Sequence, residues 1–270
     1  MPSGSDELRV DVVDGVARLT LNRPKARNAL SIGLRDDLVH AVRDCRASDE
    51  VRAVLITGAG GAFCAGMDLS ASSAANAGKP DFDPRSMSQA LREGVHALIT
   101  DLWELDKPTV AAVDGAAVGP GAHLALACDF VLVDDRAKFI WSFSKIGLVV
   151  DAGGAYLLPR LVGLAKAKEL VLLGGSLSGD DAVAAGIAYR RCASAEALDQ
   201  EATALATKLA QGPTRALGMS KRLLNRSLES SLADSLDAEA AAQALATASS
   251  DLVEGMAAFR EKRDPKFTGH

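Results

Sequence analysis

The stretch from Val113 to Asp129, VDGAAVGPGAHLALACD, places the strongest constraint on how this chain can fold. A β-branched run at residues 109–113 predicts a strand, glycines 115, 119 and 121 predict a turn, and the alanine- and leucine-rich run predicts a helix. The first N–H groups of a helix have no partner within it and carry partial positive charge. Such a turn can stabilise an oxygen atom that becomes negative during a reaction. The alternative is that the glycines only let strand and helix pack closely.

The composition indicates an ordinary globular protein. Of the 270 residues, 48% are hydrophobic and 24% are charged, and the net charge of −5 argues against binding to nucleic acid or to a membrane surface. The most apolar region, residues 109–133, is interrupted by Asp114, His123 and Asp129, so no membrane span is expected. The N-terminal residues lack the apolar stretch of a secretory signal, so the expected location is cytoplasmic.

The four cysteines predict neither a metal site nor a disulfide framework, because they show no CxxC spacing and no nearby pair of histidines. They are expected to be buried in the core or in a pocket. The four are Cys45, Cys64, Cys128 and Cys192.

Strands and helices alternate over the first 193 residues. Asp14-Gly15 predicts a hairpin turn, and Ser31 is expected to cap a helix. A segment at 70–84, rich in small residues and without periodicity, predicts a mobile, substrate-facing surface loop. Strands are expected at 8–13, 16–21, 53–57, 109–113, 130–133, 138–140 and 187–192, and further helices at 87–105, at 163–173 and from 178.

Beyond residue 193 the pattern changes to helices alone. The alanine-rich helical segments are 194–211, 213–225, 232–250 and 251–263. This change predicts an α/β core at 1–193 followed by a helical region at 194–270. Small alanine faces suit packing against another subunit, and they equally suit covering the chain's own core.

Asp151 lies among valines, an alanine and glycines. A carboxylate in apolar surroundings is costly unless it is paired or used. Aspartate is also a favoured N-cap, and a helix is expected to start at the glycines that follow. The residues by themselves leave capping and catalysis open.

Five segments together resemble the crotonase family, also called the enoyl-CoA hydratase/isomerase superfamily. They are LNRPKARNAL (21–30), AFCAGMDL (62–69), VDGAAVGPGAHLALACD (113–129), GLVVDAGGAYLLPRLVG (147–163) and EGMAAFREKRDPKF (254–267). The resemblance implies a spiral of ββα units whose C-terminal helices form a homotrimer or a hexamer of two trimers. It also implies an acyl-CoA thioester substrate, with no cofactor beyond its coenzyme A moiety.

The resemblance implies an oxyanion hole made of two backbone N–H groups. One falls on Met67 and the other on Pro120, which has no N–H. Either Gly121 supplies the second donor through a shifted turn, or the site works with one donor. Losing such a donor typically costs about 100- to 1000-fold in rate.

The resemblance also locates the acids. Where hydratases of the family carry two glutamates, this chain has His123 and Phe143, whereas Asp151 falls where the Δ3,Δ2-enoyl-CoA isomerases and the phenylacetate-type isomerases carry a catalytic acid. One carboxylate lying along C2 to C4 can remove a proton beside the thioester carbonyl and return one at C4. Asp151 is therefore the expected catalytic residue. His123 is expected either as a second acid or donor in the pocket or as a satisfied core histidine.

The expected binding residues come from the same resemblance. Lys25, Arg27 and Lys262 are candidate partners for phosphate groups. The coenzyme A and substrate contacts implied are Lys25, Ala26, Arg27, Ala65, Gly66, Met67, Asp68, Leu69, Gly119 and, from the same or a neighbouring subunit, Phe259 and Lys262, with Cys64, Trp141 and Phe143 beside the acyl group.

Three other functions are open from the sequence. One is a hydratase with rearranged acids that uses His123, and another is a non-catalytic acyl-CoA binder that lost the chemistry, as Pro120 and Phe143 suggest. The third is nucleophilic attack by Asp151 on an aryl or thioester carbon.

Overall fold

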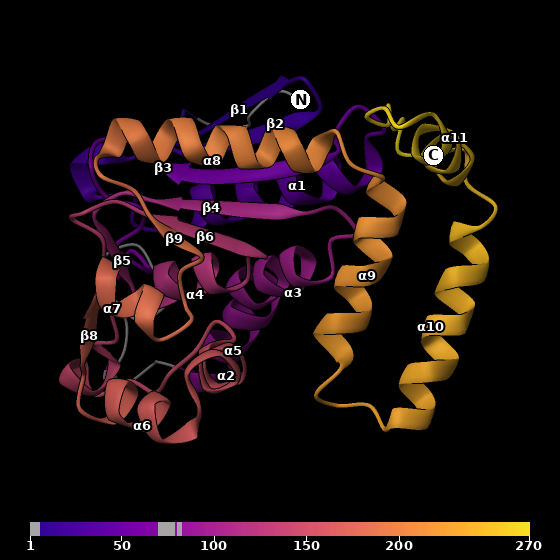
Figure 1. Ribbon diagram of the computed structural model, residues 1–270. Helices are drawn as coiled ribbons and strands as arrows, with labels where there is room; N and C mark the ends of the chain where they lie inside the picture. Colours follow the sequence, from indigo (N-terminus) through magenta and orange to yellow (C-terminus); the bar gives the residue numbers. More distant parts are fainter. Residues whose placement is uncertain (1–5, 70–78, 80–82) are drawn as a thin grey trace.

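Two β-sheets form the body of the protein (Figure 1). The structure is a computed structural model that describes residues 6–69, 79 and 83–270. The larger sheet has the order β1-β2-β3-β4-β6-β9 and the smaller one β5-β7-β8. The strands of the larger sheet are β1 (Leu8–Val13), β2 (Val16–Leu21), β3 (Ala53–Gly58), β4 (Thr109–Val113), β6 (Phe130–Val133) and β9 (Arg190–Arg191). Those of the smaller sheet are β5 (Ala116–Val118), β7 (Lys138–Ile140) and β8 (Ser176–Ser178).

The predicted hairpin is confirmed. β1 and β2 pair antiparallel with Val13 opposite Val16. Asp14 and Gly15 between them have φ values of 50° and 79°, which is the left-handed pair of a tight hairpin turn. From β2 to β9 every neighbouring pair of strands in the larger sheet is parallel.

The chain winds as a spiral between the two sheets. It runs from β4 through β5 into α4 (Pro120–Leu126), and from β6 through β7 toward α5 (Gly154–Val162) and α6 (Leu164–Leu172). It then passes through β8 and α7 (Gly179–Ala184) to β9. The expected ββα repeat is therefore present. The predicted central turn differs, because its residues 116–118 form β5 by pairing with β7, a contact between segments that meet only in the folded chain.

One predicted helix and one predicted strand have different limits in the structure. Ser31 caps α1 (Ile32–Ala47) as expected, since its hydroxyl accepts the Leu34 N–H. The helix expected at 87–105 instead comprises α2 (Pro84–Leu91), a π-helical turn (Arg92–His96) and α3 (Ala97–Trp103). The strand expected at 187–192 is reduced to β9. The loop expected at 70–84 lies outside the described residues except at 79, 83 and 84.

The π-helical turn contains a close contact with another helix. A Cβ at Gly94 would lie 2.4 Å from Nη1 of Arg35. A wider turn with a glycine leaves room for that side chain, and such turns inside α-helices are uncommon. This contact joins residues about sixty positions apart, so the helical periodicity of the segment could not reveal it.

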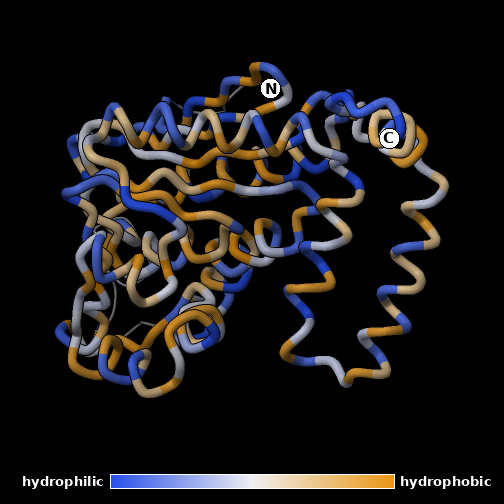
Figure 2. The backbone as a smooth tube through the Cα atoms, in the orientation of Figure 1, coloured by the Kyte–Doolittle hydropathy of each residue, from blue (hydrophilic) through white to orange (hydrophobic). Residues whose placement is uncertain are grey.

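Apolar residues fill both faces of the larger sheet (Figure 2). β3 is buried along nearly all its length, as expected for a parallel strand covered on both sides. One face packs against α1, α3 and α4, and the other against α8 (Ala195–Ala210). Although α8 follows residue 193, it packs on the sheet, and the division into two regions at that residue stays a prediction.

The remaining helices extend from the body (Figure 1). They are α9 (Thr214–Arg226), α10 (Leu232–Ala246) and α11 (Ser250–Glu261). α9 approaches the body closely, because a Cβ at Gly218 would lie 2.0 Å from the Asp106 carbonyl oxygen. The C-terminal residues fold back onto α11, where the Asp251 carboxylate accepts the N–H groups of Thr268 and Gly269.

The four cysteines are free and buried, as predicted. Among the described residues, no group of histidine, cysteine, aspartate or glutamate side chains could hold a metal ion. None of the helices in the described part of the chain has the length and apolar character needed to cross a membrane.

Candidate active site

The candidate site lies where the turn after β3 meets the turn before α4. The Cys64 N–H donates to the Ala116 carbonyl at 3.0 Å, and the Val118 N–H donates to the Cys64 carbonyl at 2.9 Å. A Cβ at Gly66 would lie 2.8 Å from the Val118 oxygen, and one at Gly121 would lie 2.4 Å from the Cys64 oxygen. Glycine is therefore required on both sides for the two turns to approach this closely.

Two backbone N–H groups in these turns are free to bind an oxygen. No carbonyl in the described part of the chain accepts the N–H of Met67 or that of Gly121. Gly119 has a φ of 49°, and its N–H donates to the Ile140 carbonyl, which fixes the turn to β7. Pro120 begins α4, with its Cδ 3.4 Å from the position of a Cβ on Gly66. As the second helical residue, Gly121 directs its N–H out of the helix N-terminus.

His123 is completely buried on α4. Its Nε2 accepts the indole N–H of Trp141 at 3.1 Å, and the ring of Phe143 lies parallel to it at 5.8 Å between centroids. A Cβ at Gly154 would lie 2.1 Å from the His123 Cε1, so the start of α5 packs directly on the ring. Burial lowers the pKa of His123 to about 4, so the ring is neutral at pH 7.

Asp151 precedes α5 without capping it. The helix begins at Gly154 with Gly153 as N-cap and no side-chain cap, so the capping alternative is wrong. Ala152 and Gly153, with positive φ values of 46° and 74°, separate Asp151 from the first helical residue. Burial raises the pKa of Asp151 to about 6, and its own backbone N–H acts in the opposite direction.

Two buried side-chain atoms lack a hydrogen-bond partner within the part of the chain that the structure describes: His123 Nδ1 and Asp151 Oδ1. The main-chain carbonyl of Asp151 interacts with the His123 ring as a hydrogen-bond acceptor, which raises the pKa of the ring against the larger effect of burial. Buried polar groups are nearly always hydrogen-bonded. The unpartnered Asp151 oxygen therefore marks this carboxylate as a candidate functional group.

The segments LNRPKARNAL (21–30) and AFCAGMDL (62–69) also lie side by side. The Ala65 N–H donates to the Arg27 carbonyl, and the Leu30 N–H donates to the Gly66 carbonyl. The side chains of Lys25 and Arg27 are exposed beside this junction, Leu69 is exposed after it, and Ala26 lies in the 3-10 helix Pro24–Ala26. The Asp68 carboxylate pairs with Arg23 at 3.0 Å.

Sequence reasoning missed Asn28, which holds this junction together. The side chain is completely buried, accepts the Arg23 N–H, and donates to the carbonyls of Ala59 and Ala62. Its φ of 57° is left-handed. Asparagine tolerates that conformation better than most residues, so an asparagine in the run ARNAL was the available signal.

Phe259 and Lys262 are not part of this cluster within one chain. Phe259 is 81% exposed on α11, and Figure 1 shows α11 at the side of the molecule opposite to β5. Any contact of these two residues with a ligand in the candidate site requires another subunit.

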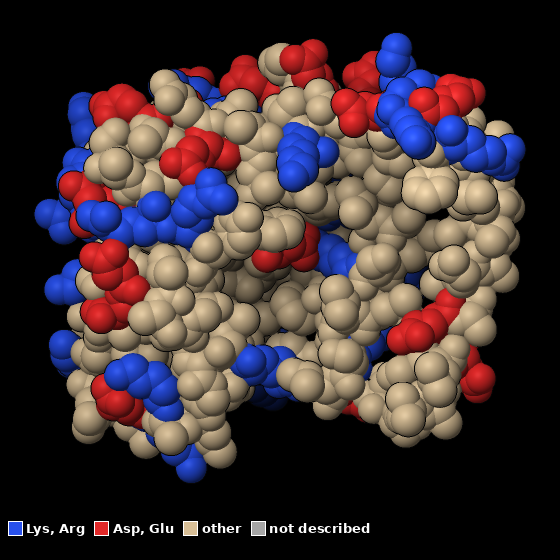
Figure 3. All heavy atoms as spheres, in the orientation of Figure 1, with Lys and Arg blue, Asp and Glu red and all other residues tan. Residues whose placement is uncertain are grey.

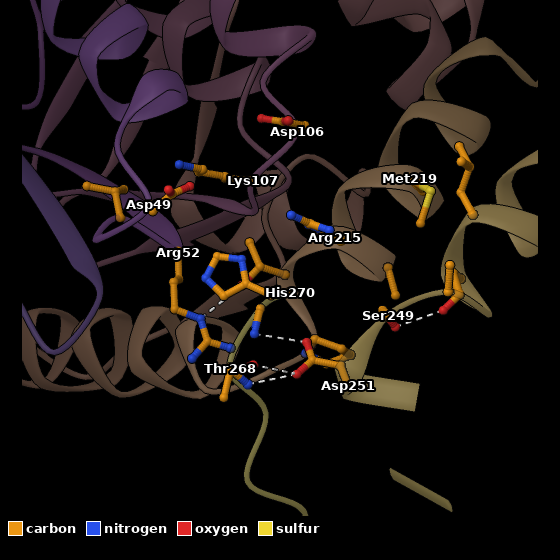
Figure 4. Close-up of a pocket in the computed structure, with 18 of the residues that line it drawn as sticks. Asp49, Arg52, Asp106, Lys107, Arg215, Met219, Ser249, Asp251, Thr268 and His270 are labelled. Atoms are coloured by element: carbon orange, nitrogen blue, oxygen red, sulfur yellow. Dashed lines mark hydrogen bonds between the residues drawn. The ribbon is translucent and has the colours of Figure 1, made fainter. Parts of the chain in front are cut away.

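A cavity of about 540 Å³ lies elsewhere, between the body, α9 and the C-terminal end (Figure 4). Arg52 crosses this seam, where its guanidinium donates to the Thr214 hydroxyl and to the carbonyls of Gly212 and Phe267. None of the predicted site residues lines this cavity. This cavity lies at the junction between the body and the C-terminal helices, because residues of both line it.

Known proteins resemble this chain over nearly its whole length. A family profile described as Enoyl-CoA hydratase/isomerase matches residues 11–270. An Escherichia coli (strain K12) protein named 1,2-epoxyphenylacetyl-CoA isomerase is 39% identical over 96% of this chain and 97% of its own length. A Streptococcus mutans protein named trans-2-decenoyl-(acyl-carrier-protein) isomerase is 33% identical over 97% of this chain and 98% of its own. The crystal structure of an enoyl-CoA hydratase from Polaromonas sp. JS666 matches with a TM-score of 0.89 and 34% identity, covering 96% of this chain and 99% of that one.

Proposed function

This chain belongs to the enoyl-CoA hydratase/isomerase family of enzymes, the crotonase superfamily, and on that premise we propose that it moves a double bond within an enoyl-CoA thioester. The observation that carries the proposal is Asp151, a half-buried carboxylate with a raised pKa and an unpartnered oxygen. The two relatives from E. coli and S. mutans are both named isomerases.

The proposed mechanism is a proton transfer from C2 to C4. Ionised Asp151 takes the C2 proton of a 3-enoyl thioester, and the electrons of that C–H bond move onto the thioester oxygen. The N–H groups of Met67 and Gly121 stabilise this negative oxygen. Return of the proton to C4 consumes the old double bond and leaves the new one between C2 and C3. The reaction needs no group beyond the coenzyme A thioester itself.

The test follows two reactions separately in the purified protein. Matched 3-enoyl-CoA and 2-enoyl-CoA thioesters are supplied, and double-bond migration and water addition are measured independently. Migration without water addition is the expected result. Binding of both thioesters with neither reaction would instead favour a non-catalytic acyl-CoA binder.

The pH dependence of migration is expected to follow Asp151. Only the ionised carboxylate can remove the proton, and its pKa is raised to about 6. The value of kcat/KM should therefore fall about tenfold per pH unit below pH 6 and level off above about pH 7. A profile that stays flat down to about pH 5 would instead point to His123, whose pKa is about 4.

Replacing Pro120 by alanine is expected to change kcat only a few-fold. The substitution adds a backbone N–H at the start of α4, but in our proposal Gly121 already supplies the second donor. A rise approaching 100-fold, the usual effect of one oxyanion donor, would show that the native site works with Met67 alone. The melting temperature should be recorded alongside, because the exchange also alters the first turn of the helix.

Water addition through His123 is the alternative activity. Two observations make it the weaker candidate: the ring is neutral and completely buried, and Phe143 lies parallel to it where hydratases of the family carry a second acid. Hydration requires an activated water as well as a proton donor. Nucleophilic attack by Asp151 would be recognised by a covalent ester on that residue.

We further propose that coenzyme A lies along the junction of residues 25–27 and 65–69, and that chains assemble as a trimer or a dimer of trimers. The assembly is supported by α10, none of whose 15 residues is buried although Leu232, Leu236 and Leu245 lie on it. Figure 3 shows few charged side chains over this helix. A second subunit would cover these leucines and bring Phe259 and Lys262 toward a neighbouring site.

A further inference from the structure

We propose that Asp134 is a positioning residue for the reaction, and that it holds the two oxyanion N–H groups in place through the backbone of Gly115. The inference rests on the proposed function, because it is there that the N–H groups of Met67 and Gly121 stabilise the thioester oxygen. Asp134 itself lies outside the site, directly after β6.

Asp134 is a completely buried carboxylate that joins the end of β6 to the segment between β4 and β5. Its Oδ1 atom accepts the backbone N–H of Gly115 at 3.1 Å and that of Arg136 at 3.2 Å. Its Oδ2 atom accepts Nε–H of Arg136 at 3.0 Å, and the same guanidinium pairs with Asp114, the residue before Gly115. A buried carboxylate is tolerated only where a counter-charge and hydrogen bonds replace its water. Arg136 supplies the charge, and Gly115 is one of the hydrogen-bond donors.

Gly115 transmits this position to the turn after β3. Its φ is 67°, and a Cβ there would lie 2.4 Å from the Gly61 carbonyl oxygen. Its own carbonyl accepts the N–H of Lys138 on β7 at 2.9 Å. Gly115 is therefore held between the Asp134 carboxylate, β7 and the segment that begins at Gly61.

β5 begins at the next residue and leads to both oxyanion donors. The Ala116 carbonyl accepts the N–H of Cys64 at 3.0 Å, and Cys64 lies three residues before Met67. In the other direction β5 continues into α4, whose second residue is Gly121. A shift of Gly115 would therefore move both N–H groups, and a misplacement of about 1 Å can cost about 100-fold in rate.

The test measures the oxyanion hydrogen bonds without turnover. Butyryl-CoA labelled with ¹³C at the thioester carbonyl is bound to the purified protein, and infrared difference spectroscopy gives the C=O stretching frequency. Hydrogen bonds to the oxygen weaken the C=O bond, so this frequency should fall when the ligand binds to the native protein. Asp134→Ala and Asp134→Leu both remove the acceptor of the Gly115 N–H, the first leaving a space and the second filling it. Either variant should lose most of the shift, and one folded variant is enough.

Two further variants serve as matched controls. Asp134→Asn keeps an oxygen that can accept the Gly115 N–H, so it should retain most of the shift. Asp135→Ala removes the exposed carboxylate next to Asp134 and should retain all of it. The value of kcat for migration should follow the same order, with a fall of about 10- to 100-fold in the alanine and leucine variants. Melting temperatures and the calorimetric stoichiometry of butyryl-CoA show whether each variant is folded with its sites intact.

The outcomes distinguish this inference from the proposed function. A native shift that every folded variant retains would overturn the role of Asp134 and leave the oxyanion site in place. Equal losses in the asparagine and leucine variants would assign the effect to the charge of Asp134 and not to its bond with Gly115, which also overturns the proposal. Absence of a shift in the native protein would overturn the proposed function itself, because the thioester oxygen would then have no donors.

Discussion

Replacing Asp151 by asparagine is expected to lower kcat for double-bond migration by about 100- to 10,000-fold, the range of general acid–base catalysis. The amide keeps the size of the side chain but cannot accept or return a proton. The measurement is the rate of conversion of a 3-enoyl-CoA to its 2-enoyl isomer under saturating substrate, at a pH above 7 where the native carboxylate is ionised.

The same substitution is expected to raise the melting temperature at pH 7. Burial raises the pKa of Asp151 from the ordinary value of an aspartate to about 6, so the folded state holds the proton more tightly than the unfolded state. Ionisation therefore favours unfolding as the pH rises through this interval. An uncharged amide removes that penalty. A variant that loses migration activity while its melting temperature rises has therefore lost its chemistry and kept its fold.

Asp11→Asn provides the matched control, since Asp11 is exposed on β1, away from the candidate site. It should leave both the rate and the melting temperature unchanged. Full migration activity in Asp151→Asn, with the control also active, would remove Asp151 from the mechanism.

Replacing Lys221 by methionine is expected to lower the free energy of unfolding by about 1–3 kcal/mol, because buried hydrogen-bond acceptors would lose their donor. The Lys221 ammonium is buried on α9 and lies 2.9 Å from the Asp129 carboxylate. That carboxylate also accepts the backbone N–H and the hydroxyl of Thr109 at the start of β4. The ammonium also donates to the carbonyls of Leu102 and Lys107, so the substitution removes a hydrogen-bonded tie between α9 and the body and leaves the Asp129 carboxylate without its counter-charge. Chemical denaturation with urea measures the change.

Lys208→Met on α8 is the control for losing a lysine, because Lys208 is exposed. It should change stability by no more than about 0.5 kcal/mol. Adding Asp129→Asn to Lys221→Met should recover part of the loss, because the uncompensated charge disappears. If the double variant were as unstable as the sum of the two single variants, the ion pair would not be the cause.

Local features of the fold could be read from the sequence wherever a residue acts on its immediate neighbours. Asp14-Gly15 turns the hairpin, and Ser31 caps α1, because both effects involve backbone groups within three residues. The limits of the helices between 84 and 103 were not predicted, and Gly94 in the π-helical turn lies against Arg35 from another helix, a contact that the local sequence does not reveal. The two-residue strand β9 exists only because β6 lies beside it.

The same distinction between local features and tertiary contacts applies to the candidate site. The sequence alone determined the glycine turns, the absence of an N–H at Pro120, and the presence of Asp151 where a carboxylate must be paired or used. Only the tertiary structure decided that Asp151 does not cap α5, that Gly121 has a free N–H, and that the indole N–H of Trp141 donates to His123. The reason is physical: a residue type and a turn are properties of the local chain. A pKa, a long-range hydrogen bond and an unpartnered buried atom depend on burial and on contacts between segments that meet only after folding.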